Sequence, residues 1–537
     1  FQAEDGIRDL VRSRGLGDVY KRQVLRDSRA AELQASLRVL EEREFIRLLE
    51  GEDHPSYTFR HILMSDAIYD TLLRRERSKL HGQVGEVIET LYADRLDSQV
   101  ELLANHFRLS PNRQKALHYL ILSGNKAARY HLNAQARQQF EFALETLGQA
   151  EPAPLQVYQV HSGLGDALAF AGEYPEARDR YLAALEALEP LDRETYLEER
   201  SSANRRIART FERKGDYEMA VQYLDKARQN LDRAAGSLPV ERARVWNDLG
   251  WIFFRQGNFT EAQRLLERGM RLVEDTGAYD TIASIYNRLG AISYNQGDWD
   301  TVALYLRKSI SIRESIRDLT GLAASLSNLG YLEIEMGEFD QALENLTRSY
   351  EIRKRYGHIE GVAVALTNLG WLRTQRGELD EARQALQEAL DLTRQIDYAL
   401  LSNQVQKNLG ELYLAEEDWP RATQVLTGII PSLIDLNTQD QLLDTYRLLG
   451  ETSLGAGDYS AAVEWGEKAE ELLARLDEEA DLTAVQRGEL RRFISMLARR
   501  SADWQTAARY LNESRVIFQQ LRSPYYQGKV LYQFGLL

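Results

Sequence analysis

The sequence predicts an all-α protein, a right-handed superhelix of antiparallel helix pairs, and three observations lead to this fold class. Seven residues after a glycine that recurs along the chain comes a turn; for Gly330 this turn is Gly337-Glu338-Phe339. Twelve residues after the same glycine comes a small residue, here Ala342. A fixed period of this kind is typical of a repeat array rather than of a single globular core. The glycine belongs to a Leu-Gly pair that recurs every 40 residues, at Gly250, Gly290, Gly330, Gly370, Gly410 and Gly450.

Helix packing gives this pattern a physical reason. The glycine removes a side chain where the first helix of each pair, helix A, meets the second, helix B, and the small residue opposite lets the backbones approach. The turn glycine adopts the left-handed conformation cheaply, and an Asp or Asn beside it caps helix B. The pattern resembles the tetratricopeptide repeat, which pairs Leu-Gly with a later alanine. Looser copies extend it to about ten repeats and a truncated one over residues 111–537.

Composition narrows the possible partners. The chain carries 82 acidic and 67 basic residues, a formal net charge of −15, whereas a phosphate-binding protein usually presents a basic stripe. It has no cysteine, which excludes disulfides, thiolate metal sites and cysteine nucleophiles. No apolar run approaches the roughly 20 residues of a membrane helix. We therefore expect a cytoplasmic protein that uses this portion to bind neither nucleic acid nor membrane.

The first 23 residues, FQAEDGIRDLVRSRGLGDVYKRQ, share no periodicity with the rest of the chain. The run from Asp18 to Gln23 resembles a translated transposon-end adapter from the preparation of a sequencing library. We therefore expect residues 1–23 to be a non-native tail that takes no part in the fold.

Residues 24–110 follow a different pattern. A helical stretch at residues 31–42 leads into two strand-like runs, residues 45–49 and 56–60, which a turn at residues 51–55 joins. A helix followed by a short hairpin is the arrangement of a winged helix. We therefore expect a winged-helix-like segment and a helical connector before the repeats.

This segment resembles the C-terminal side of STAND-class signalling ATPases, in which a nucleotide-binding domain leads through a winged helix into a tetratricopeptide arm. The resemblance implies an ATPase domain upstream, in the same polypeptide. It rests on a series of motifs, Tyr57-Thr58-Phe59-Arg60-His61, Ala67-Ile68-Tyr69, Leu72-Leu73 and Leu80-His81.

Motifs for catalysis are missing from the sequence. It has no G-x-x-x-x-G-K-[ST] phosphate loop and no G-x-S-x-G, and its eight histidines form neither H-x-x-x-H nor H-x-x-E-H. We predict no enzyme activity, no metal and no cofactor for this chain. His61 and His81 have two interpretations: they pack or cap helices, or, as the resemblance implies, one of them contacts a bound diphosphate.

Helical periodicity places a set of amides and aromatic rings away from the core. At 100° per residue, offsets −6, −3, −2, +1, +4 and +5 from the repeat glycine share one arc of helix A, which lines the groove in tetratricopeptide proteins. We predict that these side chains bind an extended peptide, through its backbone and its apolar side chains. Alternatively, each asparagine bonds along the helix surface and the rings pack on adjacent repeats. The set comprises Asn247, Trp251, Asn287, Asn328, Tyr331, Asn368, Trp371 and Asn408.

Three functions are compatible with this organisation. The first is the sensor and scaffold arm of a multidomain regulatory ATPase, which binds a protein partner or inducer in the groove. The second is a free-standing peptide-binding adaptor. The third is an enzyme whose catalytic domain lies in another part of the gene.

Overall fold

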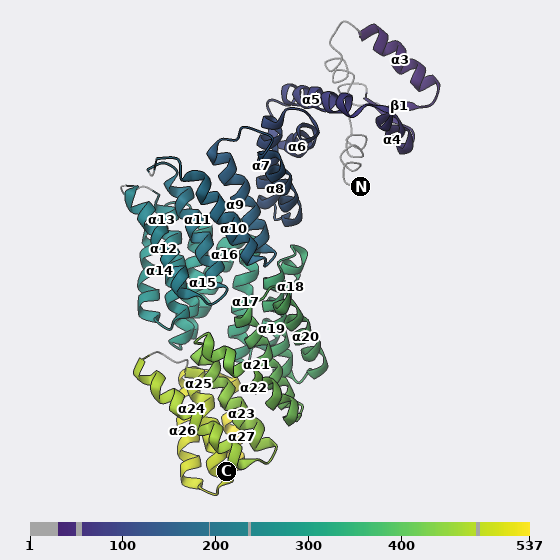
Figure 1. Cartoon of the computed structure of the whole chain (residues 1–537). Helices are drawn as coiled ribbons and strands as arrows, with labels where there is room; N and C mark the ends of the chain where they lie inside the picture. The colour runs from purple at the N-terminus through teal and green to yellow at the C-terminus, as the bar shows by residue number, and fades with distance from the viewer. Residues whose placement is uncertain (1–29, 50–55, 193, 235–237, 480–483) are drawn as a thin grey trace. The chain divides into compact units, whose positions relative to one another are not determined.

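Helices follow one another along almost the whole chain, with one small hairpin near the N-terminus (Figure 1). The computed structural model describes residues 30–49, 56–192, 194–234, 238–479 and 484–537. Residues 1–23, for which a non-native origin is predicted, and the predicted turn at residues 51–55 lie outside the described residues. The predicted all-α fold class is confirmed.

Packing divides the chain into two units. One runs up to residue 167 and includes residues 186–188, and the other comprises residues 168–185 and 189–537. The boundary lies inside a helix, whereas the predicted start of the repeats lies at residue 111. The elements up to this helix are α3 (Ala30–Glu42), β1 (Ile46–Leu49), β2 (Ser56–Phe59), α4 (Ile62–Thr71), α5 (Arg74–Leu91), η2 (Leu96–Gln99), α6 (Val100–Leu109), α7 (Arg113–Arg129), α8 (Asn133–Leu147) and α9 (Pro154–Phe170).

The hairpin after α3 has the position expected of a wing. Strands β1 and β2 pair antiparallel, with Ile46 opposite Phe59 and Leu49 opposite Ser56. Both strands lie within the runs that the sequence predicts. Helices α5 to α8 then form the core of this unit, where Phe107 stacks on Tyr119 with ring centroids 5.4 Å apart.

Two histidines form a buried pair in the first unit. The Nδ1 atoms of His81 (α5) and His106 (α6) lie 3.1 Å apart, and the Tyr69 hydroxyl lies 3.1 Å from Nε2 of His81. Only one of the two Nδ1 atoms can carry the shared proton. Nε2 of His106 has no hydrogen-bond partner within the described part of the chain. Burial lowers the pKa of His81 to about 4, with a further contribution from Arg108, and the pKa of His106 to about 3.

The second unit consists mainly of consecutive helix pairs. Neighbouring A helices contact each other, and consecutive B helices approach less closely, which places the A helices on the inner side of the array. We call this side the inner face. The elements, with A before B in each pair after α10, are α10 (Tyr174–Leu188), α11 (Leu197–Glu212), α12 (Tyr217–Arg233), α13 (Pro239–Arg255), α14 (Phe259–Val273), α15 (Tyr279–Asn295), α16 (Trp299–Ser315), α17 (Leu319–Met336), α18 (Phe339–Arg355), α19 (Ile359–Arg376), α20 (Leu379–Gln395), α21 (Ala399–Ala415), α22 (Trp419–Asp435), α23 (Gln439–Gly455), α24 (Tyr459–Glu479), α25 (Ala484–Arg500), α26 (Trp504–Gln520) and an A helix, α27 (Pro524–Leu536).

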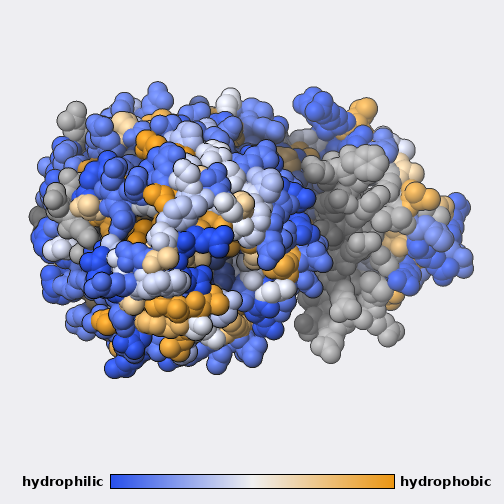
Figure 2. All heavy atoms as spheres, turned by 90° about the horizontal axis from the view of Figure 1, so that it is seen from below, coloured by the Kyte–Doolittle hydropathy of each residue, from blue (hydrophilic) through white to orange (hydrophobic). Residues whose placement is uncertain are grey.

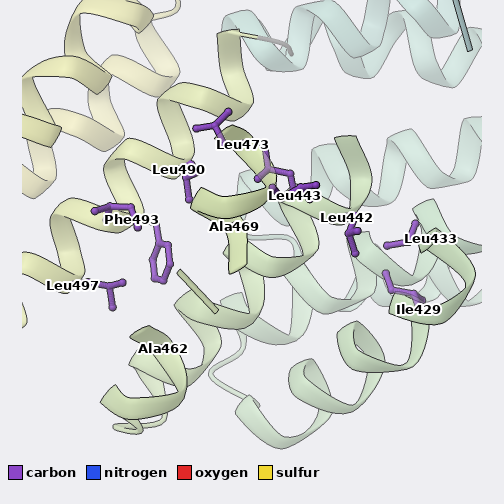
Figure 3. Close-up of a cluster of buried hydrophobic side chains, with 12 residues drawn as sticks. Ile429, Leu433, Leu442, Leu443, Ala462, Ala469, Leu473, Leu490, Phe493 and Leu497 are labelled. Atoms are coloured by element: carbon purple, nitrogen blue, oxygen red, sulfur yellow. The ribbon is translucent and has the colours of Figure 1, made fainter. Parts of the chain in front are cut away.

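The repeat glycines lie where A and B helices meet most closely. A Cβ atom added at Gly410 would lie 2.5 Å from Cγ of Leu426, four residues after the small residue Ala422. Leucine at the same place in helix B faces Gly250, Gly290, Gly330 and Gly370. We call this contact between helices A and B at the repeat glycine the seam. At Gly450 the ring of Phe493 from the following repeat takes the place of the leucine. Figure 3 shows Phe493 among the apolar side chains that join consecutive repeats.

The turns between A and B helices have the predicted chemistry. Gly257, Gly297 and Gly337 have φ values of +80°, +75° and +82°, the left-handed region that favours glycine. The next residue caps helix B where it is short and polar: the side chain of Asn258 accepts a hydrogen bond from the backbone N–H of Glu261.

Repeats that are far apart in the sequence also contact each other in the second unit. The Ser523 hydroxyl donates to the carbonyl of Glu335, 188 residues away, at 2.7 Å. Trp299 and Leu329 share a buried apolar cluster with Phe518 and Leu521. The array therefore winds far enough for its last helices to pack against helices α15 to α17.

The surface is predominantly hydrophilic on the face that Figure 2 shows, with scattered apolar side chains. Among the described residues, no helix combines the length and the apolar character needed to cross a membrane.

The packing predicts opposite effects for two neighbouring glycines. Gly410→Ala should lower the free energy of unfolding by about 1–3 kcal/mol, because the new methyl group overlaps Leu426. Gly428→Ala is the matched control, because Gly428 lies in helix α22 with open space around its Cα. It should raise stability by about 0.5–1 kcal/mol. Urea unfolding measures both, and equal effects of the two changes would contradict this account of the seam.

The histidine pair predicts that the first unit loses stability in acid. Below pH 6.5 the two histidines of the unfolded chain become protonated, whereas those of the folded pair stay neutral down to about pH 4. Each histidine should therefore cost about 1.4 kcal/mol per pH unit within this window. Hydrogen exchange of α5 and α6, corrected for intrinsic rates, should show protection falling from pH 7 to pH 5. A His81→Leu/His106→Leu variant should flatten this slope and a change of the exposed His118 to Gln should not; an unchanged slope in the double variant would refute the assignment.

Candidate functional site

The predicted asparagines lie on the inner face, where they link consecutive A helices. Three side chains donate to a side-chain oxygen of a neighbouring A helix, and one donates to a backbone carbonyl. These hydrogen bonds join Asn247 to Ser284 at 3.0 Å, Asn328 to Asn287 at 3.2 Å, Asn368 to Ser327 at 3.2 Å and Asn408 to the carbonyl of Thr367 at 3.4 Å. These hydrogen bonds join neighbouring A helices, whereas the alternative interpretation placed the bonds of each asparagine along the surface of its own helix.

Exposure separates the predicted residues into two groups. Asn247, Asn408 and Trp371 are only 3%, 4% and 9% exposed, so the expectation that they face an open groove is wrong. The inter-helix hydrogen bonds bring adjacent A helices together over the two asparagines, and Trp371 joins the apolar cluster around Leu372. Asn328 is exposed, and Trp251, Asn287, Tyr331 and Asn368 are half-buried.

The aromatic side chains of the predicted set contact each other and the ionic groups around them. Tyr331 stacks on Trp371 with ring centroids 5.0 Å apart, and Tyr294 meets Tyr331 edge-on at 5.8 Å. The indole N–H of Trp251 donates to Glu212 at 3.2 Å. These rings therefore pack within the array, where Trp371 is buried and Trp251 and Tyr331 are half-buried.

One junction between A helices is more open than the others. Helices α15 and α17 approach each other less closely than the other consecutive A helices from α11 to α25. The exposed Asn328 and its partner Asn287 lie at this junction. The hydrogen bond between them uses Nδ2 of Asn328 and Oδ1 of Asn287. The Oδ1 atom of Asn328 and the Nδ2 atom of Asn287 have no hydrogen-bond partner within the described residues.

An ion network that sequence periodicity did not predict surrounds Asp248 of α13. Its carboxylate accepts hydrogen bonds from Arg209 at 3.1 Å, from Arg288 at 3.1 Å and from Arg205 at 3.2 Å. Burial alone would raise the pKa of Asp248, but the three guanidinium groups hold it well below its usual range. Arg205 also bonds Glu241 at 3.1 Å.

A second network lies on helices α21 to α25. Burial alone would raise the pKa of Asp444. The positive charges of Lys407 and Arg447 outweigh the effect of burial and hold the pKa of this carboxyl well below its usual range. In the sequence these residues are charged positions close to the repeat glycine, such as Asp248 two residues before Gly250 and Asp444 six residues before Gly450. The ion pairs include Lys407 with Asp444 at 2.9 Å, Arg447 with Asp444 and Glu451 at 2.8 Å each, and Arg492 with Glu451 at 2.7 Å and Glu489 at 2.9 Å.

Glu335 of α17 is a buried carboxyl outside both networks. It is 2% exposed, and its Oε2 atom has no hydrogen-bond partner within the described residues. Burial raises its pKa to about 7, against the opposing effects of Tyr526, Tyr294 and Lys529. Within the same part of the chain, no three histidine or carboxylate side chains are grouped so that they could hold a metal ion.

Comparison with known proteins supports the repeat assignment. The model of the tetratricopeptide repeat family matches five overlapping stretches, residues 156–233, 198–275, 241–315, 281–355 and 321–395. No curated protein sequence matches the chain.

Similar solved structures include a Rap protein complexed with Competence and Sporulation Factor, at 15% identity and a TM-score of 0.51, covering 68% of this chain and 99% of that one. Aspartyl phosphate phosphatase F from Bacillus subtilis has 12% identity and a TM-score of 0.42, covering 66% and 94%. The Rap conjugation gene regulator of plasmid pLS20, in complex with the Phr* peptide, has 15% identity and a TM-score of 0.44, covering 65% and 97%. At these identities the likeness concerns the fold alone. Residues 156–395 of this chain therefore match the model of the tetratricopeptide repeat family, and the helical solenoid is similar in fold to the first of these Rap proteins.

Proposed function

We propose that the inner face of helices α13 to α21 binds an extended segment of a protein partner, with its centre at the junction of α15 and α17. The observation that carries this proposal is the Asn287–Asn328 pair. It is accessible, it lies where consecutive A helices are least closely packed, and its free amide oxygen and NH₂ face no competing partner.

The free amide groups match the chemistry of an extended backbone. A peptide strand presents alternating N–H and C=O groups that have no partners of their own. The Oδ1 atom of Asn328 accepts from an N–H, and the Nδ2 atom of Asn287 donates to a C=O. The half-buried rings of Tyr331 on α17 and Trp251 on α13 provide apolar surface for the side chains of the same peptide.

The fold comparison adds support of a general kind. The Rap protein of similar fold was solved with Competence and Sporulation Factor bound to it. A solenoid of this type is therefore able to hold a ligand, and the inner face is where this chain has free polar groups.

We further propose that the repeats serve as the sensor and scaffold arm of a STAND-type regulatory ATPase in the cytoplasm. The motifs from Tyr57 to His81, and a helix and hairpin formed by α3, β1 and β2, support this context. Binding of a partner to the arm would then bias a nucleotide switch in the same polypeptide. A free-standing adaptor is the alternative, and the neighbouring gene sequence distinguishes the two.

The Asn287→Ala/Asn328→Ala double variant tests the binding face. It should weaken the binding of captured peptides about tenfold or more, because it removes hydrogen bonds to the peptide backbone. An array of peptides from the host proteome, probed with the whole chain, identifies the ligands, and titration calorimetry measures their affinity.

A matched control is available on the outer side of the array. Gln384→Ala/Gln387→Ala removes two exposed amides from helix α20 and should leave affinity unchanged. Equal binding by both double variants would place the site elsewhere. Both variants should unfold at the same urea concentration as the parent chain within error, because none of the four side chains is buried.

The ATPase context is tested by the gene itself. Sequencing the natural gene upstream of residue 24 should reveal a G-x-x-x-x-G-K-[ST] phosphate loop in the same reading frame. An upstream frame with a secretion signal and no phosphate loop would refute the proposed context and favour the adaptor.

A further inference from the structure

We propose that the side chain of Glu335 is a proton-sensitive switch in the contact between distant repeats of the second unit. Helix α27 stays docked on α17 while this carboxyl is neutral, and the contact loosens when the carboxyl is ionised. The switch acts on the closure of the array and does not depend on the proposed binding function.

Glu335 lies where two segments that are 188 residues apart meet. Its backbone carbonyl accepts a hydrogen bond from the Ser523 hydroxyl at 2.7 Å, and the same hydroxyl oxygen accepts from the backbone N–H of Tyr526 at the start of α27. Two residues further on, a Cβ atom added at Gly337 would lie 3.0 Å from Cβ of Tyr525. The end of α17 and the start of α27 are therefore in close contact, and the charge of Glu335 acts directly on this contact.

The carboxyl of Glu335 is buried in a way that favours its neutral form. The residue is 2% exposed, and Oε2 has no hydrogen-bond partner within the described part of the chain. An ionised carboxylate buried without a cation beside it is far costlier than the neutral acid. Asp248 and Asp444 differ in this respect, because arginine and lysine side chains bond directly to each of them.

Neighbouring groups act on the ionised form of Glu335 in both directions. The hydroxyls of Tyr294 and Tyr526 and the ammonium of Lys529 stabilise it, whereas the carboxylate of Asp444 opposes it. The groups that face this carboxyl, with the groups coupled to them, are Tyr294 of α15, Tyr331 of α17, Asp440 and Asp444 of α23, Glu489 of α25, and Tyr526 and Lys529 of α27.

Lys529 is the nearest candidate for a balancing charge, and another carboxylate already attracts it. Its ammonium lies 3.8 Å from Glu489 and 4.6 Å from the ring centroid of Tyr525. Burial therefore outweighs the stabilising groups and raises the pKa of Glu335 to about 7, whereas a glutamate in water titrates near pH 4.5.

The direction of the pH dependence follows from this difference. Undocking of α27 exposes the carboxyl of Glu335 to water, where its pKa returns to about 4.5. Between pH 4.5 and pH 7 the docked state holds a proton that the undocked state has lost, so each unit rise in pH favours undocking about tenfold. Above pH 7 both states are ionised and the dependence levels off. The contact is thus strongest in acid, whereas the histidine pair of the first unit is weakest there.

Hydrogen exchange of the whole chain between pH 5 and pH 8, corrected for intrinsic rates, tests the switch. Protection of the amides of α27 and of the last turn of α17 should fall about tenfold per pH unit up to about pH 7 and then level off. Protection of α27 that does not change with pH in the parent chain would overturn the proposal.

Two matched variants connect the fall in protection to Glu335. Glu335→Gln keeps the shape of the side chain and is neutral at every pH, so the protection of α27 should become independent of pH. Glu351→Gln removes an exposed carboxyl from helix α18 and should leave the fall unchanged. The same fall in Glu335→Gln as in the parent chain would assign the dependence to another group and refute the switch.

Tyr526→Phe provides a test that does not require Glu335→Gln to fold. It removes a hydroxyl that stabilises the ionised form of Glu335, so the pH at which protection levels off should move upward. An unchanged levelling-off pH in Tyr526→Phe would contradict the assignment to Glu335.

Discussion

The close approach of helices A and B at the repeat glycine is the contact on which the rest of the second unit depends. At Gly370 and Gly410 an added Cβ would lie 2.5 Å from a leucine of helix B, so the two helix surfaces fit without room for another atom. Because packed interiors tolerate little change in volume, the same seam at successive glycines gives successive pairs a nearly constant geometry. A constant step between pairs then aligns equivalent residues of the A helices along one face.

That alignment explains why the polar side chains of the inner face are paired with one another. Side chains at equivalent offsets meet across adjacent A helices, so amides bond amides or hydroxyls and guanidiniums bond carboxylates. Buried polar groups must be paired, and most of those on this face are. The Asn287–Asn328 pair at the α15–α17 junction differs, because it is accessible and retains an amide oxygen and an NH₂ without a partner among the described residues. The winding of the array adds a constraint, because Ser523 and Phe518 hold its end against helices α15 to α17.

The sequence predicted the local features well because each depends on residues within one repeat. The glycine seam, the turn glycines, the caps such as Asn258 and the hairpin of β1 and β2 all follow from short-range patterns. The exposure of the predicted site residues could not be obtained in this way. Asn247, Asn408 and Trp371 lie on the same arc of helix A as Asn328 and Tyr331, and their burial depends on how closely two A helices approach.

Long-range contacts explain what else the sequence left open. The hydrogen bond between Ser523 and Glu335 depends on the superhelical rotation summed over many repeats, and no local sequence motif indicates that rotation. The ion network around Asp248 draws residues from three A helices, and each charge alone resembles an ordinary solvated residue. The buried histidine pair likewise unites His81 with His106, for which the sequence offered no shared motif.

Photo-cross-linking measures most directly whether the inner face is where a partner binds. p-Benzoylphenylalanine is placed at position 324, one helical turn before Asn328 on α17, and separately at position 304, where Leu304 is exposed on the outer helix α16. Each protein is irradiated with the peptides that the parent chain captures. The account predicts cross-linked peptide at position 324 and little at position 304, with excess unlabelled peptide competing at position 324. Equal labelling at the two positions, or labelling at position 304 alone, would contradict it.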